Sequence, residues 1–282
     1  MSRKKNEPDP GPPLPDETLD RIDQAWDALE KGDIDTAGAE AEELMEETKG
    51  HPEVQFLMGA ALLESGFPDE ALEYLEKSKG RVDNSNVHGY YIATTLFELI
   101  RYEDSESAYR IVLAGEDDRA PVLYGLAQVL EHLGRYAEAE GMYEEAHAAD
   151  PGCYPLPTRM QREAFEQVVR EAANHLPDEL LVHLKDVPIV VQDLPERAVL
   201  RQEEGDPITP GVLGLFIGHS LRDKSVFSPP DMPPTIFIYQ RNLERQCPTR
   251  EELEHEIYLT LYHELGHYLG LEEEELEERG LE

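Results

Sequence analysis

Small residues and turn formers recur along the first half of the chain at a fixed interval of 34 residues. Each copy has a turn position, a small residue five positions after it and another small residue seven positions before it. In that order the three sets are Gly32, Gly66, Ile100 and Gly134; Ala37, Ala71, Ser105 and Ala139; and Ala25, Gly59, Ala93 and Ala127. This agreement predicts four helical hairpins, whose small residues let the two helices of each hairpin approach closely.

The second half of the chain has a mixed pattern that indicates both helices and strands. Apolar residues at helical spacing predict a helix over 159–175, and a shorter helix follows Pro177. Three short apolar runs, bounded by Pro- and Gly-rich segments, predict strands over 188–192, 212–217 and 235–240. Thr249 with Glu252 three residues later predicts a capping box at the start of a long final helix.

These patterns divide the chain into an all-α helical solenoid and a small α+β domain. Residues 1–16 are polar and rich in proline, which predicts a disordered tail. We expect the repeats over 17–152, a linker over 153–158 and the α+β domain over 159–282.

The composition excludes several classes of function. The formal net charge of −36 argues against nucleic acid or anionic lipid as a partner, because both require clustered Lys and Arg. The only cysteines, Cys153 and Cys247, form no disulfide framework. The first residues have no apolar segment typical of a secretory signal, and no run approaches the length of a transmembrane helix. We therefore expect a cytoplasmic protein.

The final helix contains a pattern that suits a metal ion. His263 and His267 are four residues apart and lie on one helical face, where two imidazoles can bind a single zinc ion. Glu264 follows the first histidine and is placed to act as a general base on an activated water. Gly270 can end the helix in the left-handed conformation and turn the following residues back toward the histidines.

Two segments resemble known families. The segment GRYAEAEGMYEEAHAADP (134–151) resembles the tetratricopeptide repeat, a family that generally binds peptides or partner proteins. The segment HELGHYLGLEEEEL (263–276) resembles the H-E-x-x-H-x-x-G-x-x-D motif of the minimal zincins, which are small metallopeptidase-like domains.

The zincin resemblance implies a site built from four residues. It makes His263, His267 and Glu273 the metal ligands and Glu264 the general base. The family usually has Asp where this chain has Glu273, so the neighbouring Glu272, Glu274 and Glu275 stay open as alternatives. His219 is a further candidate for a ligand or a substrate contact.

The resemblances together imply a zinc metallopeptidase that holds one Zn²⁺ per chain, with a peptide or protein substrate or adaptor bound on the repeats. The alternative function is a protein-binding scaffold or regulatory protein whose metal domain is catalytically inactive. For the repeats themselves, the alternative is a passive spacer or a dimerisation element. The zincin resemblance also implies that the strand at 235–240 lies at the edge of its sheet and pairs with an extended substrate.

Overall fold

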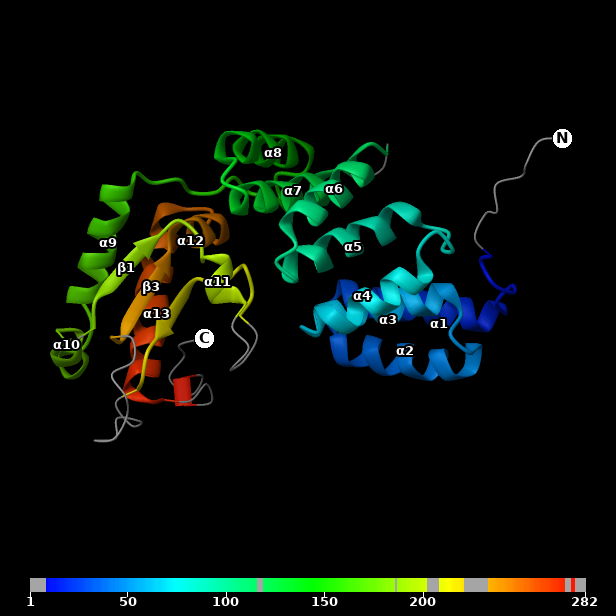
Figure 1. Cartoon of the computed structure of the whole chain (residues 1–282), viewed down its shortest axis with the longest axis horizontal. Helices are drawn as coiled ribbons and strands as arrows, with labels where there is room; N and C mark the ends of the chain where they lie inside the picture. The colour runs from blue at the N-terminus through cyan, green and yellow to red at the C-terminus, as the bar shows by residue number, and fades with distance from the viewer. Residues whose placement is uncertain are drawn as a thin grey trace. The chain divides into compact units, whose positions relative to one another are not determined.

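The computed structural model describes residues 9–115, 119–185, 187–201, 208–220, 233–271 and 275–276. The chain forms two compact units, Met1–Tyr154 and Pro155–Glu282. Among the described residues, the regular elements of the first unit are all helices, whereas the second unit combines helices with a sheet (Figure 1). No helix of the described residues is long and apolar enough to cross a membrane.

The first unit is a row of helical hairpins in which each helix packs against the next one along the chain (Figure 1). Its helices are α1 (Asp16–Glu30), α2 (Ile34–Thr48), α3 (Pro52–Glu64), α4 (Pro68–Ser78), α5 (Ser85–Glu98), α6 (Tyr102–Leu113), α7 (Ala120–His132) and α8 (Tyr136–Ala149). This arrangement confirms the predicted helical solenoid.

The turn inside each hairpin has the same left-handed backbone conformation. Gly32, Gly66 and Gly134 have φ values of 76°, 81° and 72°, and Ile100 has 60° at the equivalent position. In each copy the residue after the turn position donates its N–H to a carbonyl five residues before it, at 2.8–2.9 Å. This is the Schellman motif, which satisfies carbonyls that the end of a helix leaves without a partner.

The small positions of the repeat pattern lie where the two helices of a hairpin cross. Ala37, Ala71, Ser105 and Ala139 are all fully buried. A Cβ atom on Gly59 would lie 2.8 Å from the Leu75 Cγ atom, so α3 and α4 approach too closely there for any larger residue. The repeat spacing therefore follows from the space available between paired helices.

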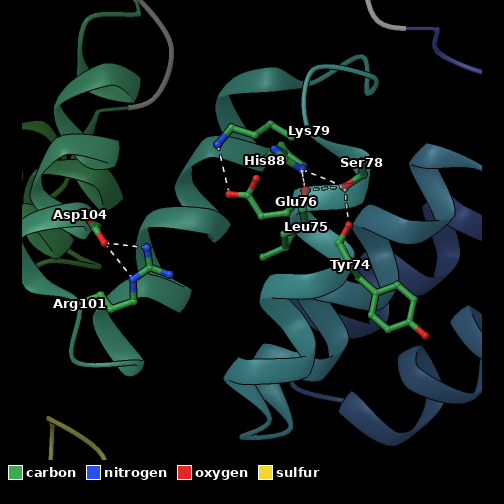
Figure 2. Close-up of polar contacts among 8 residues, drawn as sticks. All are labelled: Tyr74, Leu75, Glu76, Ser78, Lys79, His88, Arg101 and Asp104. Atoms are coloured by element: carbon green, nitrogen blue, oxygen red, sulfur yellow. Dashed lines mark hydrogen bonds and ion pairs between the residues drawn. The ribbon is translucent and has the colours of Figure 1, made fainter.

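A buried histidine links the second hairpin to the third (Figure 2). The Nε2 atom of His88, on α5, lies 2.9 Å from Ser78 Oγ and 3.0 Å from the carbonyl oxygen of Leu75, both on α4. Burial lowers the pKa of His88 from its ordinary value, although the hydrogen bond to Leu75 acts in the opposite direction. The neutral imidazole is therefore the form that the folded protein favours.

The second unit contains a three-stranded sheet and a set of helices that share one hydrophobic core. Strand β1 (Ile189–Gln192) is parallel to β3 (Thr235–Tyr239), and β2 (Gly214–Ile217) is antiparallel to β3 on its other side. The helices are α9 (Arg162–Asn174), α10 (Asp178–Leu184), α11 (Arg197–Leu200), α12 (Gln240–Gln246) and α13 (Arg250–Leu269). The predicted small α+β domain is thereby confirmed.

The expectation that the strand at 235–240 lies at a sheet edge is wrong. The described sheet has the order β1–β3–β2, so β3 is paired on both sides. Ile238 is fully buried and stands opposite both Val191 and Gly214. Strand order depends on tertiary pairing, which the local pattern of this strand does not contain. Among the described strands, β1 and β2 form the edges.

Candidate metal centre

Helix α13 carries the H-E-x-x-H residues, and both of its ends are defined by local hydrogen bonds. Thr249 Oγ1 accepts a hydrogen bond from the Glu252 N–H at 3.2 Å, and a Glu252 carboxylate oxygen accepts one from the Thr249 N–H at 3.3 Å. Gly270 ends the helix with a φ of 82°. The predicted capping box and left-handed glycine are therefore both present.

The two histidines of the motif bring their ring nitrogens together. The Nε2 atoms of His263 and His267 are 2.9 Å apart, and the ring planes are inclined at 79°. Zinc binds imidazole nitrogen at about 2.0–2.1 Å, so one ion can be within bonding distance of both atoms at this separation. Both side chains are half-buried. The donor atoms and their convergence therefore fit a zinc ion.

Glu264 lies between α13 and the sheet. Its side chain is buried, and it contacts β2 at Gly214. A Cβ atom at Gly214 would lie 2.6 Å from Thr260 Cγ2 and 2.9 Å from Glu264 Cγ. Only a glycine lets the strand approach the helix so closely, and sequence reasoning missed this role. The signal was available, because a glycine inside a predicted strand often marks a close approach.

Tyr239, at the end of β3, is fully buried and senses the charge of Glu264. Its pKa is raised above its ordinary value, mainly by burial and then by the negative charges of Glu264 and Glu196. The phenol therefore stays protonated at neutral pH.

Glu273, the predicted third ligand, lies outside the described residues, as do Glu272 and Glu274. The described residues on either side of this segment return to the motif helix at Gly266. The Leu271 N–H donates to the Gly266 carbonyl at 3.0 Å, and Leu276 packs against the Gly266 Cα. Within the part of the chain that the structure describes, no three His, Cys, Asp or Glu side chains form a group able to hold a metal.

A cavity of about 240 Å³ opens beside the motif. It lies between α13, the end of α12 and the segment that leads into β2. Its lining consists of Val212, Leu213, Gly214, Gln246, Glu256, Leu259, Thr260, His263 and Glu264. The general-base candidate and one metal-ligand candidate therefore face a space large enough for a side chain.

His219, the further candidate from the sequence, lies outside this group, as does His255 on the motif helix. His255 is exposed on the first half of α13, and His219 is exposed just after β2. Neither lines the cavity beside Glu264.

Comparison with known families assigns both units. Residues 184–281 match the zincin-like metallopeptidase family, and residues 22–86 and 91–152 match the tetratricopeptide repeat family. As predicted, the family models find tetratricopeptide repeats in the first unit and a zincin-like metallopeptidase domain over residues 184–281. A search of curated proteins finds no match.

Several solved structures are similar to this chain, and two of them are described as tetratricopeptide repeat proteins. The crystal structure of MamA shares 22% identity over 45% of this chain and 75% of its own, with a TM-score of 0.39. The tetratricopeptide repeat protein TTC0263 of Thermus thermophilus shares 18% identity over 49% of this chain and 76% of its own, with a TM-score of 0.42. YrrB, described as a repeat protein with an unusual peptide-binding site, shares 15% identity over 48% of this chain and 70% of its own, with a TM-score of 0.40.

Proposed function

We propose that the second unit is a zinc-dependent peptidase with His263, His267 and Glu273 as metal ligands and Glu264 as general base. The observation that carries this proposal is the convergence of the two Nε2 atoms, 2.9 Å apart, on a helix whose buried Glu264 lines the same cavity as His263. The match of residues 184–281 to the zincin-like metallopeptidases supports the same reaction class.

In the proposed reaction, the zinc ion and Glu264 would have separate roles. A bound zinc ion would supply Lewis-acid polarisation of the scissile carbonyl and a water of lowered pKa. The Glu264 carboxylate accepts a proton from the attacking water and returns it to the nitrogen of the leaving amine. The close approach of β2 at Gly214 restricts the buried Glu264 side chain, which lines the same cavity as His263.

Strand β2 replaces β3 as the candidate partner of an extended substrate. β2 is an edge of the described sheet, and its first residue, Gly214, contacts Glu264. A peptide that pairs with the outer edge of β2 would lie next to the strand whose first residue approaches Glu264. Backbone pairing holds a substrate without requiring a particular sequence.

The repeats are proposed to bind a protein substrate or adaptor. A cavity of about 590 Å³ lies among α1, α5, α6, α7 and the end of the unit. Its lining combines tyrosines and short apolar residues with amides: Glu30, Asn84, Asn86, Val87, Tyr90, Tyr91, Val112, Leu113, Arg119, Pro121, Val122 and Tyr154. Such a surface suits a peptide, because aromatic side chains give contact area while amides bind its backbone.

This cavity also supports the second candidate function, a binding scaffold whose metal domain is inactive. Cleavage of a peptide library by the zinc-loaded full chain distinguishes the two. We expect cleavage by the unmodified chain and none by Glu264→Gln, which should keep its zinc. Zinc binding without cleavage of any library peptide would favour the scaffold.

The third ligand has its own test. Glu273→Gln should weaken zinc binding by about 10-fold or more, because a neutral amide is a poorer ligand than a carboxylate. Glu275→Gln is the matched control, two residues away in the same acidic segment. Zinc loss in the control alone would assign the ligand to Glu275.

A further inference from the structure

The cavity beside Glu264 extends along one face of α13 toward the start of the helix. Glu256, Thr260 and His263 line it at intervals of four and three residues, which is the spacing of a single helical face. The seven residues from Glu256 to His263 correspond to about 10.5 Å along the helix axis. The cavity therefore connects the reacting groups to a carboxylate roughly two turns away.

The walls and the far end of this cavity differ in polarity. Val212, Leu213 and Leu259 make its sides apolar. Glu256 lies on α13 about two helical turns from His263, and the exposed amide side chain of Gln246 also lines the cavity. A side chain that extends from the motif toward Glu256 would therefore pass between apolar residues and finish at a negative charge.

The Glu256 carboxylate is half-buried, and no hydrogen bond or ion pair reaches it from the described residues. Other glutamates nearby have partners. Glu244 accepts hydrogen bonds from Arg159 and from the Met160 N–H, and Glu254 pairs with Arg250 at 2.7 Å. Glu256 is therefore available to a cation that enters the cavity.

A second carboxylate, that of Glu252, adds to the negative electrostatic potential around Glu256. Burial raises the pKa of the neighbouring Cys247 thiol to about 11, and the charges of Glu256 and Glu252 contribute to this shift. The Glu252 carboxylate already accepts a hydrogen bond from the Thr249 N–H in the helix cap. The charges of Glu252 and Glu256 therefore both act on the region around Cys247.

We propose that this cavity is a specificity pocket for a lysine or arginine side chain next to the scissile bond, with Glu256 binding its cationic end. The proposal rests on the peptidase function and names its substrate class. Lysine and arginine have long apolar stems that pack along apolar walls while the charged end reaches a partner. A short or acidic side chain would leave Glu256 without a counter-charge.

Binding of short peptides tests the pocket separately from catalysis. The probes are capped pentapeptides of alanine with a central lysine, norleucine or glutamate. Norleucine keeps the four-carbon stem of lysine and lacks its terminal ammonium group. Affinities are measured on the zinc-loaded full chain carrying Glu264→Gln, which prevents cleavage. The same peptides are then offered to the unmodified chain as substrates.

We expect the lysine peptide to bind about 10-fold more tightly than the norleucine peptide, as a hydrogen-bonded charge pair implies. Adding Glu256→Gln should abolish this preference, and Glu256→Lys should reverse it toward the glutamate peptide. Glu254→Gln removes the same charge from the same helix outside the cavity and should leave the preference intact.

Equal binding of the lysine and norleucine peptides would overturn the pocket, and so would a preference that survives Glu256→Gln. If the peptidase proposal failed instead, the binding and cleavage results would form a different pattern. In that case the lysine preference and its loss in Glu256→Gln would persist in binding, but the unmodified chain would cleave none of the peptides.

Discussion

Ile100 has a backbone conformation that β-branched residues normally avoid. Its φ of 60° places it in the left-handed region, which costs an L-residue about 1–2 kcal/mol. The side chain is only 6% exposed, and burying an isoleucine contributes about 1.5–3 kcal/mol. Burial therefore offsets the backbone strain, which explains how the third repeat keeps its turn without glycine.

The glycines at the other turns test the same argument. Gly134→Ala should lower the free energy of unfolding by about 1 kcal/mol. A Cβ at this position meets nothing within 4 Å, so the loss would come from the φ of 72° alone. Urea unfolding of the full chain measures it.

Gly141 provides the matched control in the same repeat. It lies inside α8, and a Cβ there also has open space. Gly141→Ala should therefore raise the free energy of unfolding by about 0.5–1 kcal/mol, because alanine favours a helix. Two changes of the same sign would show that the left-handed conformation is not what the turn requires.

The contact between β2 and α13 depends on the absence of a side chain at Gly214. Gly214→Ala should cost about 1–3 kcal/mol of stability and displace Glu264, because the new methyl group overlaps Thr260 and Glu264. Thermal unfolding and the rate of peptide cleavage report the two effects. Gly211→Ala, whose Cβ would approach nothing closer than 3.9 Å, should change neither. Unchanged stability in Gly214→Ala would show that the strand can move away from the helix.

The link between α4 and α5 predicts a pH dependence. The pKa of His88 is lowered in the folded protein, so below the ordinary histidine value of about 6.5 the unfolded chain binds a proton that the folded chain does not. The free energy of unfolding should therefore fall as the pH decreases from about 7. His88→Gln should flatten this dependence, whereas His175→Gln, at an exposed site, should not. The measurement is urea unfolding between pH 5 and 8; an unaltered slope in His88→Gln would contradict it.

Features that arise from neighbouring residues were predictable from the sequence. The capping box of Thr249 and Glu252 and the left-handed Gly270 each depend on local spacing, and both are present. The central position of β3 was not predictable, because strand order depends on pairing between distant segments. The glycine in the strand pattern signalled a close approach at Gly214, but not its partner, because α13 lies about 50 residues away in the sequence.

Because the chain forms two compact units, we expect each unit to fold when it is expressed alone. Residues 155–282 have their own core, which includes the motif helix, and residues 1–154 have theirs. Expressed alone, the second unit should bind about one zinc per chain, and zinc should not change the thermal unfolding of the first. Zinc binding that requires both units would show that the repeats contribute a ligand.

Elemental analysis of the purified full chain examines the metal centre on which the proposed function depends. We expect about one zinc per chain in the unmodified protein and in Glu264→Gln, and little or none in His263→Ala and His267→Ala. Circular dichroism of each variant confirms that it is folded. Absence of zinc from the unmodified chain after incubation with the ion, or full retention of zinc in both histidine variants, would contradict the assignment of His263 and His267.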